Sequence, residues 1–287
     1  MTRDLSRTTI LTLMLTLAFF AFSLSAGGRV RLVPQEYSTI QRALDNSDSG
    51  DTVFVAEGRY RGAITMREDV ALIGAGAERT ILTGKRNKPV IRGAQGATLR
   101  HFTIQGGQMG VLCENTVMLI EDCIVQGNTG TGIHIVIALP VIRNNVVMRN
   151  GWSGIFCETT RSHRGYIAHN IIAENNYSGV LLSGSSEVLL ENNVFYFNKQ
   201  YGVFAADGAR RSRIVNNNFF GNRQAGSVHA NIDHSNLHAD PEYPNLGTRD
   251  GHAFWDTIPA ALRGRGREGR DIGLVRRVMF VPEKSKD

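Results

Sequence analysis

The chain has 287 residues, three cysteines and a formal net charge of +6 at pH 7. The length is compatible with one large domain, and the spacing of the cysteines matches no zinc site. Six arginines lie between residues 263 and 277. Basic charge of this kind suits an acidic glycan, the cell envelope or lipid headgroups, and a solvated basic tail explains it equally well.

Residues 1–26 have the three parts of a secretory signal peptide. Arg3 and Arg7 precede an apolar run over residues 10–24, and small residues follow it. The run is short for a bilayer span, which favours cleavage over a retained anchor. We therefore expect a secreted or periplasmic protein with no stable membrane insertion after cleavage. In such a protein the basic charge favours an acidic glycan over nucleic acid as partner.

Residues 27–50 are expected to form an N-terminal cap. A short amphipathic helix is predicted over residues 37–45, with Ser38 or Thr39 as its N-cap. If the repeats that follow stack into a solenoid, such a cover is needed, because the first coil would otherwise expose a strand edge and the core.

From about residue 90 to residue 231 the sequence repeats itself in three columns. The first column is Asn128, Asn150, Asn175, Asn198 and Asn222, the second is Gly132, Gly154, Gly179, Gly202 and Gly226, and the third is Cys123, Asn145, Asn170, Asn193 and Asn217. The steps along the first column are 22, 25, 23 and 24 residues. Three columns that keep their register over this length predict a solenoid.

Short apolar runs between the columns identify the type of solenoid. Residues 133–136 and 146–147 are examples of these β-branched runs, and neither a leucine-rich frame nor room for a crossover helix is present. Successive units must then stack strand on strand at about 4.8 Å. This predicts an all-β fold, a single-stranded parallel β-helix, with an aliphatic ladder inside it. The ladder is Ile120, Ile142, Ile167, Leu190 and Ile214.

The asparagine and glycine columns are interpreted as corner residues. Asn145 and its equivalents are expected to form an amide ladder in the left-handed conformation, and the glycines are expected at bends that a side chain would obstruct. Metal or sugar ligands are the less favoured interpretation. Cys113 and Cys157 share an inward column with Ile135 between them, so about 9–10 Å separates them, beyond disulfide reach. We expect three buried free thiols.

The stretch YSTIQRALDNSDSGDTVFVAEGRYRGAITM, followed by VALIGAGAERTILTG, resembles the opening of the pectin lyase-like superfamily. The later HADPEY and GREGRDIGL resemble the tail of many exported members. The resemblance implies a right-handed parallel β-helix, which we assign to residues 51–231. Residues 232–287, where the period ends, are expected to form an irregular C-terminal flank and cap.

The same superfamily contains lyases, hydrolases, esterases, epimerases and proteins that are not enzymes. The paired aspartates and glutamines of pectinesterases have no counterpart in the repeats, and the Gly-His-Gly of polygalacturonases is missing. Ile232-Asp233-His234 matches three letters of a pectate lyase strand, without the expected arginine motifs, and we regard it as coincidence. Whether the chain is an enzyme stays open. If it is one, the resemblance implies a polysaccharide lyase, hydrolase or epimerase.

The candidate site lies in the longest repeat, where the surplus residues 158–164 form an insertion. Insertions in repeat proteins become loops on one face, often the binding face. The expected catalytic residues are Glu158, His163 and His134, and the expected substrate-binding residues are Arg161, Arg164, Glu114 and Phe156. Arginine would hold a uronate while His or Glu moves a proton. A solvated, salt-bridged turn is the alternative, and no metal or cofactor is expected.

Leu112, Phe156, Leu181 and Phe204 are predicted to point outward as an apolar stripe. The favoured interpretation is that the proline-rich flank covers this stripe, and stacking of sugar rings on it is the other.

The leading functional hypothesis is an exported, monomeric β-helix protein that binds an acidic extracellular or cell-wall polysaccharide and either only binds it or also cleaves or modifies it. The alternatives are a non-catalytic structural or adhesive surface protein and a periplasmic accessory factor for metalloenzyme maturation. The last would need an exposed cluster of Met, His or Cys.

Overall fold

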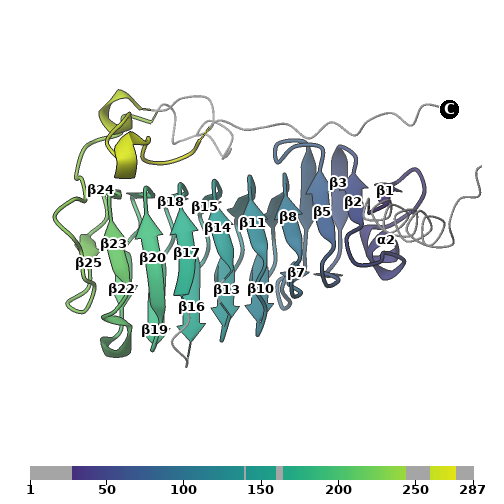
Figure 1. Cartoon of the computed structure of the whole chain (residues 1–287), viewed down its shortest axis with the longest axis horizontal. Coiled ribbons are helices and arrows are strands. Elements are labelled where there is room, and N and C mark those ends of the chain that lie inside the picture. Colours follow the sequence, from purple (N-terminus) through teal and green to yellow (C-terminus); the bar gives the residue numbers. More distant parts are fainter. Residues whose placement is uncertain (1–27, 139, 160–163, 244–258, 276–287) are drawn as a thin grey trace, which may run out of the picture.

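The structure is a computed structural model that describes residues 28–138, 140–159, 164–243 and 259–275. Within these residues the strands form three parallel sheets that wind along one axis (Figure 1). The sheets contain nine, eight and eight strands, and every strand pair within the described residues is parallel. The predicted all-β parallel β-helix is confirmed. Residues 1–26, the predicted signal peptide, lie outside the described residues.

We number the sheets in the order in which each coil visits them. Sheet 1 contains β1 (Val30–Val33), β2 (Thr52–Val55), β5 (Ala71–Gly74), β8 (Thr98–Arg100), β11 (Leu119–Glu121), β14 (Val141–Arg143), β17 (Arg164–Ala168), β20 (Glu187–Glu191) and β23 (Arg213–Val215). Sheet 2 contains β3 (Gly58–Arg61), β6 (Thr80–Thr83), β9 (Thr103–Gln105), β12 (Ile124–Gln126), β15 (Val146–Met148), β18 (Ile171–Ala173), β21 (Val194–Tyr196) and β24 (Asn218–Phe220). Sheet 3 contains β4 (Ile64–Thr65), β7 (Ile91–Arg92), β10 (Val111–Glu114), β13 (Ile133–Val136), β16 (Ile155–Thr159), β19 (Ser178–Gly184), β22 (Tyr201–Ala205) and β25 (Gln224–Gly226).

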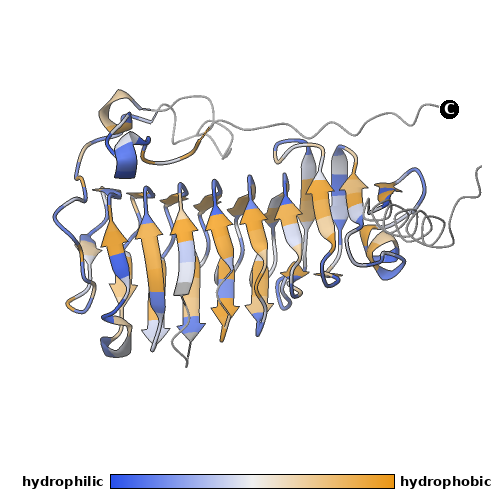
Figure 2. Ribbon diagram, viewed as in Figure 1, coloured by the Kyte–Doolittle hydropathy of each residue, from blue (hydrophilic) through white to orange (hydrophobic). Residues whose placement is uncertain are grey.

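The interior is built from ladders of like residues. Ile120, Ile142 and Ile167 pair in register on neighbouring strands of sheet 1 and are buried, which confirms the aliphatic ladder. Hydrophobic residues run along the strands, and many of the turns between them are polar (Figure 2). Cys113 and Cys157 lie on either side of Ile135 in sheet 3, and all three cysteines are buried and free, as expected.

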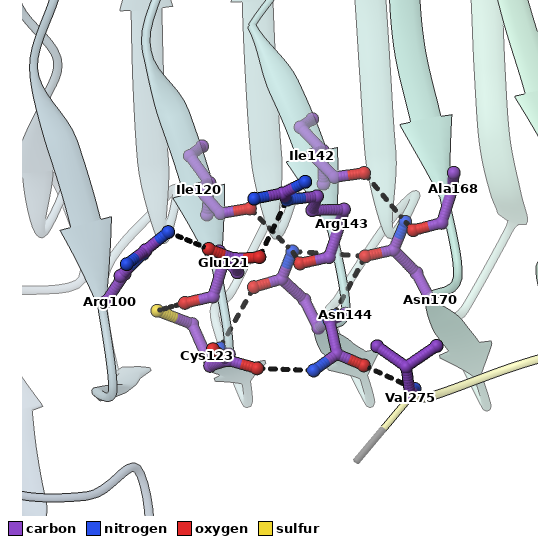
Figure 3. Close-up of polar contacts among 12 residues, drawn as sticks. Arg100, Ile120, Glu121, Cys123, Ile142, Arg143, Asn144, Ala168, Asn170 and Val275 are labelled. Atoms are coloured by element: carbon purple, nitrogen blue, oxygen red, sulfur yellow. Dashed lines mark hydrogen bonds and ion pairs between the residues drawn. The ribbon is translucent and has the colours of Figure 1, made fainter. Parts of the chain in front are cut away.

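Two asparagine ladders close the corners on either side of sheet 2. In the first ladder, the backbone N–H and the Nδ2 of Asn145 both donate to Oδ1 of Asn170, at 2.9 and 3.0 Å. The Nδ2 of Asn170 also donates to the carbonyl oxygens of Ile142 and Ala168, at 2.9 Å each (Figure 3). Asn150 and Asn175 repeat this pattern in the second ladder. The predicted amide ladder is confirmed.

The left-handed residue of each corner was predicted one position too late. Positive φ is found instead at the position directly before the ladder residue. The residues there are His101 (63°), Asp122 (53°), Asn144 (57°), His169 (55°), Asn192 (55°) and Asn216 (54°). The ladder side chain must point inward to reach the next coil, so the residue before it makes the bend. The glycines of the second column do prevent a clash, because a Cβ on Gly154 would lie 2.7 Å from the carbonyl oxygen of Gly179.

A short helix packs against the first strands at the N-terminal end of the solenoid. α2 (Ile40–Asp45) has Thr39 as its N-cap, whose side chain accepts from the backbone N–H of Arg42. β1 precedes this helix and pairs with β2, so sheet 1 begins before residue 51. At the other end Asn236 continues the first ladder, accepting from the N–H of Asn217 at 2.8 Å. Stacking therefore extends on both sides of residues 51–231.

Residues 259–275 of the C-terminal flank, with the short 3-10 helices η3 (Ala260–Leu262) and η4 (Arg267–Gly269), cover the outer face of sheet 2 (Figure 1). Leu262, Ile272 and Leu274 pack there against residues of β15, β18 and β21. The prediction that this flank covers the apolar stripe is wrong for the described residues, because that stripe belongs to sheet 3. Sheet 2 has the more continuous aliphatic outer face. No helix among the described residues is long and apolar enough to span a membrane.

Candidate functional site

The apolar stripe is a single row across five strands of sheet 3. Leu112, His134, Phe156, Leu181 and Phe204 pair in register on β10, β13, β16, β19 and β22. Alternation along each strand directs these side chains away from the core, because their neighbours on both sides are buried core residues. The row therefore lies on the outer face of sheet 3, where Leu112 and Leu181 are buried and Phe156 and Phe204 are partly exposed.

His134 and Glu158 meet on this surface. His134 Nε2 and Glu158 Oε2 are 3.1 Å apart, and the imidazole stacks on the ring of Phe156 with centroids 4.7 Å apart. Burial lowers the pKa of His134, while the hydrogen bond and charge of Glu158 oppose that shift. An ionised carboxylate only accepts, so the neutral imidazole donates from Nε2 and keeps its lone pair on Nδ1. Such a pair can orient a base for proton transfer.

The other predicted site residues are not shown to contact the His134–Glu158 pair. Glu114 forms an ion pair with Arg92 on the neighbouring strand β7, and Val136 separates it from Glu158 in the same row. Arg164 begins β17 on sheet 1 opposite Glu187, and its side chain is outside the described part of the chain. Arg161 and His163 lie outside the described residues altogether. The structure thus brings together His134, Phe156 and Glu158.

Three aromatic residues that were not predicted extend this surface. Trp152 contacts Phe156 edge to face with centroids 5.2 Å apart, and Tyr177 stacks on Trp152 at 6.1 Å. Phe204 then contacts Tyr177 at 5.9 Å and Tyr201 at 5.3 Å. We call these rings, together with His134, the aromatic ridge: His134, Trp152, Phe156, Tyr177, Tyr201 and Phe204. Trp152 is 41% exposed. The sequence feature that could have identified the three new rings is an aromatic residue two or three positions after a ladder asparagine.

Charges of opposite sign lie on the two sides of the ridge. Lys199 and Arg223 are exposed and directly follow ladder asparagines on adjacent coils, close to Tyr201 at the start of β22. Arg223 donates to the side chain of Gln200 at 3.2 Å. Glu158 is half exposed at the opposite end of the strands. A ligand lying on the ridge would therefore meet cations on one side and the His134–Glu158 pair on the other.

The outer face of sheet 1 is charged instead. Glu121 lies between Arg100 and Arg143 and forms ion pairs with both (Figure 3). Further along, a pocket of about 240 Å³ is lined by Gly165, Glu187, Val188, Leu189, Arg211 and Arg213. Among the described residues, no three His, Cys, Asp or Glu side chains are placed to hold a metal ion.

Residues 90–238 match the family model described as a right handed beta helix region. The chain belongs to this right-handed β-helix family. Its fold is similar to that of an alginate lyase from Paenibacillus sp. str. FPU-7, with a TM-score of 0.52, 16% identity, and 63% of this chain and 73% of that chain covered. It also matches the A-module of the Azotobacter vinelandii mannuronan C-5 epimerase AlgE4, with a TM-score of 0.45, 17% identity and 72% of each chain covered.

A third similar structure is the pectin methylesterase PemA from Erwinia chrysanthemi. The TM-score is 0.40 at 9% identity, and the match covers 80% of this chain and 98% of that chain. At such identities the likeness shows the fold alone. The resemblance to pectin lyase-like β-helices is confirmed, and the activity has to be argued from the residues of this chain.

Proposed function

We propose that this β-helix protein binds an acidic polysaccharide along the outer face of sheet 3. The aromatic ridge is the observation that carries the proposal. Its rings are linked by centroid distances of 4.7 to 6.1 Å and continue from coil to coil along the axis. A contiguous, partly exposed aromatic surface is typical of a ligand-binding face, and flat rings offer apolar area to the faces of sugar rings at little cost in side-chain entropy.

The charges beside the ridge favour an acidic ligand. Lys199 and Arg223 occupy equivalent positions on adjacent coils, so their backbones are about 4.8 Å apart. A polymer that presents carboxylates at short intervals can meet both cations while its rings lie on Tyr177 and Tyr201. The likeness in fold to an alginate lyase supports a polysaccharide as the ligand class.

The His134–Glu158 pair supports a second step, proton transfer on the bound sugar. Glu158 orients the imidazole, and the low pKa of His134 leaves it neutral and able to accept a proton at neutral pH. The roles of Arg161 and Arg164 in holding a carboxylate, and of His163 as a further acid or base, stay predictions. Export through the signal peptide at residues 1–26 is part of the same proposal, and N-terminal sequencing of the mature protein tests it.

Binding to a panel of acidic and neutral glycans tests the main proposal. Trp152→Ala combined with Tyr177→Ala should weaken binding to an acidic glycan by at least about tenfold, roughly 1.4 kcal/mol. The matched control is Phe197→Ala, because Phe197 is 46% exposed but lies at a corner outside the ridge. Equal binding by the double variant and the control would refute the ridge as the binding surface.

Two further variants separate the contributions of charge and chemistry. Lys199→Gln with Arg223→Gln should weaken binding more at low salt than at high salt, because exposed charges are screened. His134 is part of the ridge, so His134→Gln should weaken binding, but by less than the Trp152 and Tyr177 double change, and it should abolish any unsaturated product formed from uronans. If His134→Gln forms product at the wild-type rate, the pair is not the proton-transfer group.

A further inference from the structure

The C-terminal segment 259–275, which we call the strap, is tied to one corner of the solenoid by hydrogen bonds. The corner residues are the left-handed residues between sheets 1 and 2. The N–H of Val275 donates to Oδ1 of Asn144 at 2.7 Å (Figure 3), and the N–H of Gly273 donates to the carbonyl oxygen of Asn192 at 2.8 Å. The N–H of Arg267 donates to Oδ1 of Asn192 at 2.9 Å.

His169 is the one described titratable side chain of this corner that bonds directly to the strap. It is buried, its Nδ1 is 3.1 Å from the carbonyl oxygen of Gly273, and its Nε2 is 3.3 Å from Nδ2 of Asn192. A carbonyl oxygen only accepts, so Nδ1 carries the proton. The amide of Asn192 cannot turn round, because its Oδ1 already accepts from Arg267. Nε2 must therefore accept from Nδ2, and the imidazole must be neutral.

The charges around His169 come from β20 and from the strap. Glu191 and Asp271 favour the protonated imidazole, and Arg270 disfavours it. Glu191 is already engaged, because it accepts from the hydroxyl of Tyr166 at 2.9 Å and from Arg267 at 3.0 Å. Asp271 accepts from the N–H of Gly264 at 2.8 Å. Desolvation is the largest influence, and the net result is a lowered pKa for His169.

We propose that the strap is an acid-released cover whose attachment requires neutral His169. Protonation places a second N–H on Nε2, directly against the Nδ2 donor of Asn192. The bond between them is lost, and a cation is buried beside Arg270. Detaching the strap lets water solvate that cation. The same movement uncovers the apolar outer face of sheet 2, where Ile171, Val194 and Tyr196 now pack against Leu262 and Ile272.

The direction with pH follows from linkage. The pKa of His169 is lowered in the attached state, so the detached state takes up the proton first. Attachment is at full strength above about pH 6.5, the ordinary value for histidine, and weakens as the pH falls below it. Because a single proton is involved, the equilibrium for detachment rises by no more than about tenfold for each pH unit.

Amide hydrogen exchange of the full chain tests this inference. Exchange at Ile272 and Gly273, corrected for the intrinsic effect of pH, should accelerate between pH 7.5 and pH 5, while β15 in the solenoid stays protected. The informative variant is His169→Asn, because asparagine occupies the equivalent left-handed position at Asn144 and Asn192 and does not titrate. Its strap should exchange at a corrected rate that does not change with pH.

Asp271→Asn is the matched control, because it removes the strap carboxylate that favours protonated His169 and leaves His169 in place. It should keep the acid response. A wild-type strap with no acceleration, or a His169→Asn strap with the full acceleration, would overturn the inference. Binding of an apolar dye at pH 5 provides a second readout, and it should increase in the wild type and in Asp271→Asn but not in His169→Asn.

Discussion

Replacing Asn170 with alanine should lower the free energy of unfolding by about 3–5 kcal/mol. The side chain takes part in five hydrogen bonds that join three coils. Truncation leaves the buried backbone N–H of Asn145 without its partner, which costs about 1–3 kcal/mol. The carbonyl oxygens of Ile142 and Ala168 each lose a bond, which adds about 1 kcal/mol apiece.

Urea unfolding followed by circular dichroism measures this loss, provided that the transition is cooperative in both proteins. Asn176→Ala is the matched control. Asn176 lies one position after the ladder residue Asn175, and its side chain is exposed. We expect the control to change stability by less than about 0.5 kcal/mol.

A loss below about 1 kcal/mol for Asn170→Ala would refute the reasoning, because it would mean that water or a shifted backbone satisfies the orphaned groups. The ladder would then be a consequence of the coil geometry and not one of its causes. If Asn170→Ala loses about 3–5 kcal/mol of unfolding free energy and Asn176→Ala loses almost none, the amides hold the coils together.

Three further predictions concern the interior. Ile142→Asp should abolish soluble expression or lower the melting temperature severely, because it buries an unpaired charge between two coils, and an unchanged melting temperature would contradict the ladder. Gly154→Ala should cost about 1–3 kcal/mol in thermal or urea unfolding, since its Cβ would meet the carbonyl oxygen of Gly179 at 2.7 Å. Burial raises the pKa of Cys113 and Cys157 to about 12, so the native protein should not react with a thiol reagent at pH 8, and rapid labelling without denaturant would contradict their burial.

The fold could be predicted because every coil must solve the same packing problem. A residue that points inward meets its equivalent on the next coil, so the same side chain is selected again, as in Ile120, Ile142 and Ile167. The corner amides repeat for the same reason, since each one bonds its equivalent. Periodicity in the sequence is therefore a direct record of contacts along the axis. The left-handed position was misplaced because the column shows which residue is shared and does not show which way it points.

The strap and the ridge could not be predicted in this way. The strap is held to Asn144, His169 and Asn192 by its own backbone, and backbone donors and acceptors leave no mark in a sequence. To predict that the strap lies on sheet 2, one would have to choose between the outer faces of sheets 2 and 3, which are both apolar. For the candidate site, the row and the neighbouring coils predicted the meeting of His134 and Glu158. Trp152 reaches Phe156, and Tyr177 reaches Trp152, from turns whose direction the sequence does not give.

Residues that point outward from a β-helix can differ from one coil to the next without disturbing the stacked interior. Among the inward residues a single polar substitution disturbs two interfaces, so variation there is suppressed by stability alone. The outward row of sheet 3 instead changes from leucine to histidine to phenylalanine on successive coils. The left-handed corner position is variable as well, with His101, Asp122, Asn144, His169, Asn192 and Asn216 on successive coils. Interactions outside the stacked interior therefore set the residues of both columns, and one column lies in the proposed glycan surface while part of the other lies beneath the strap.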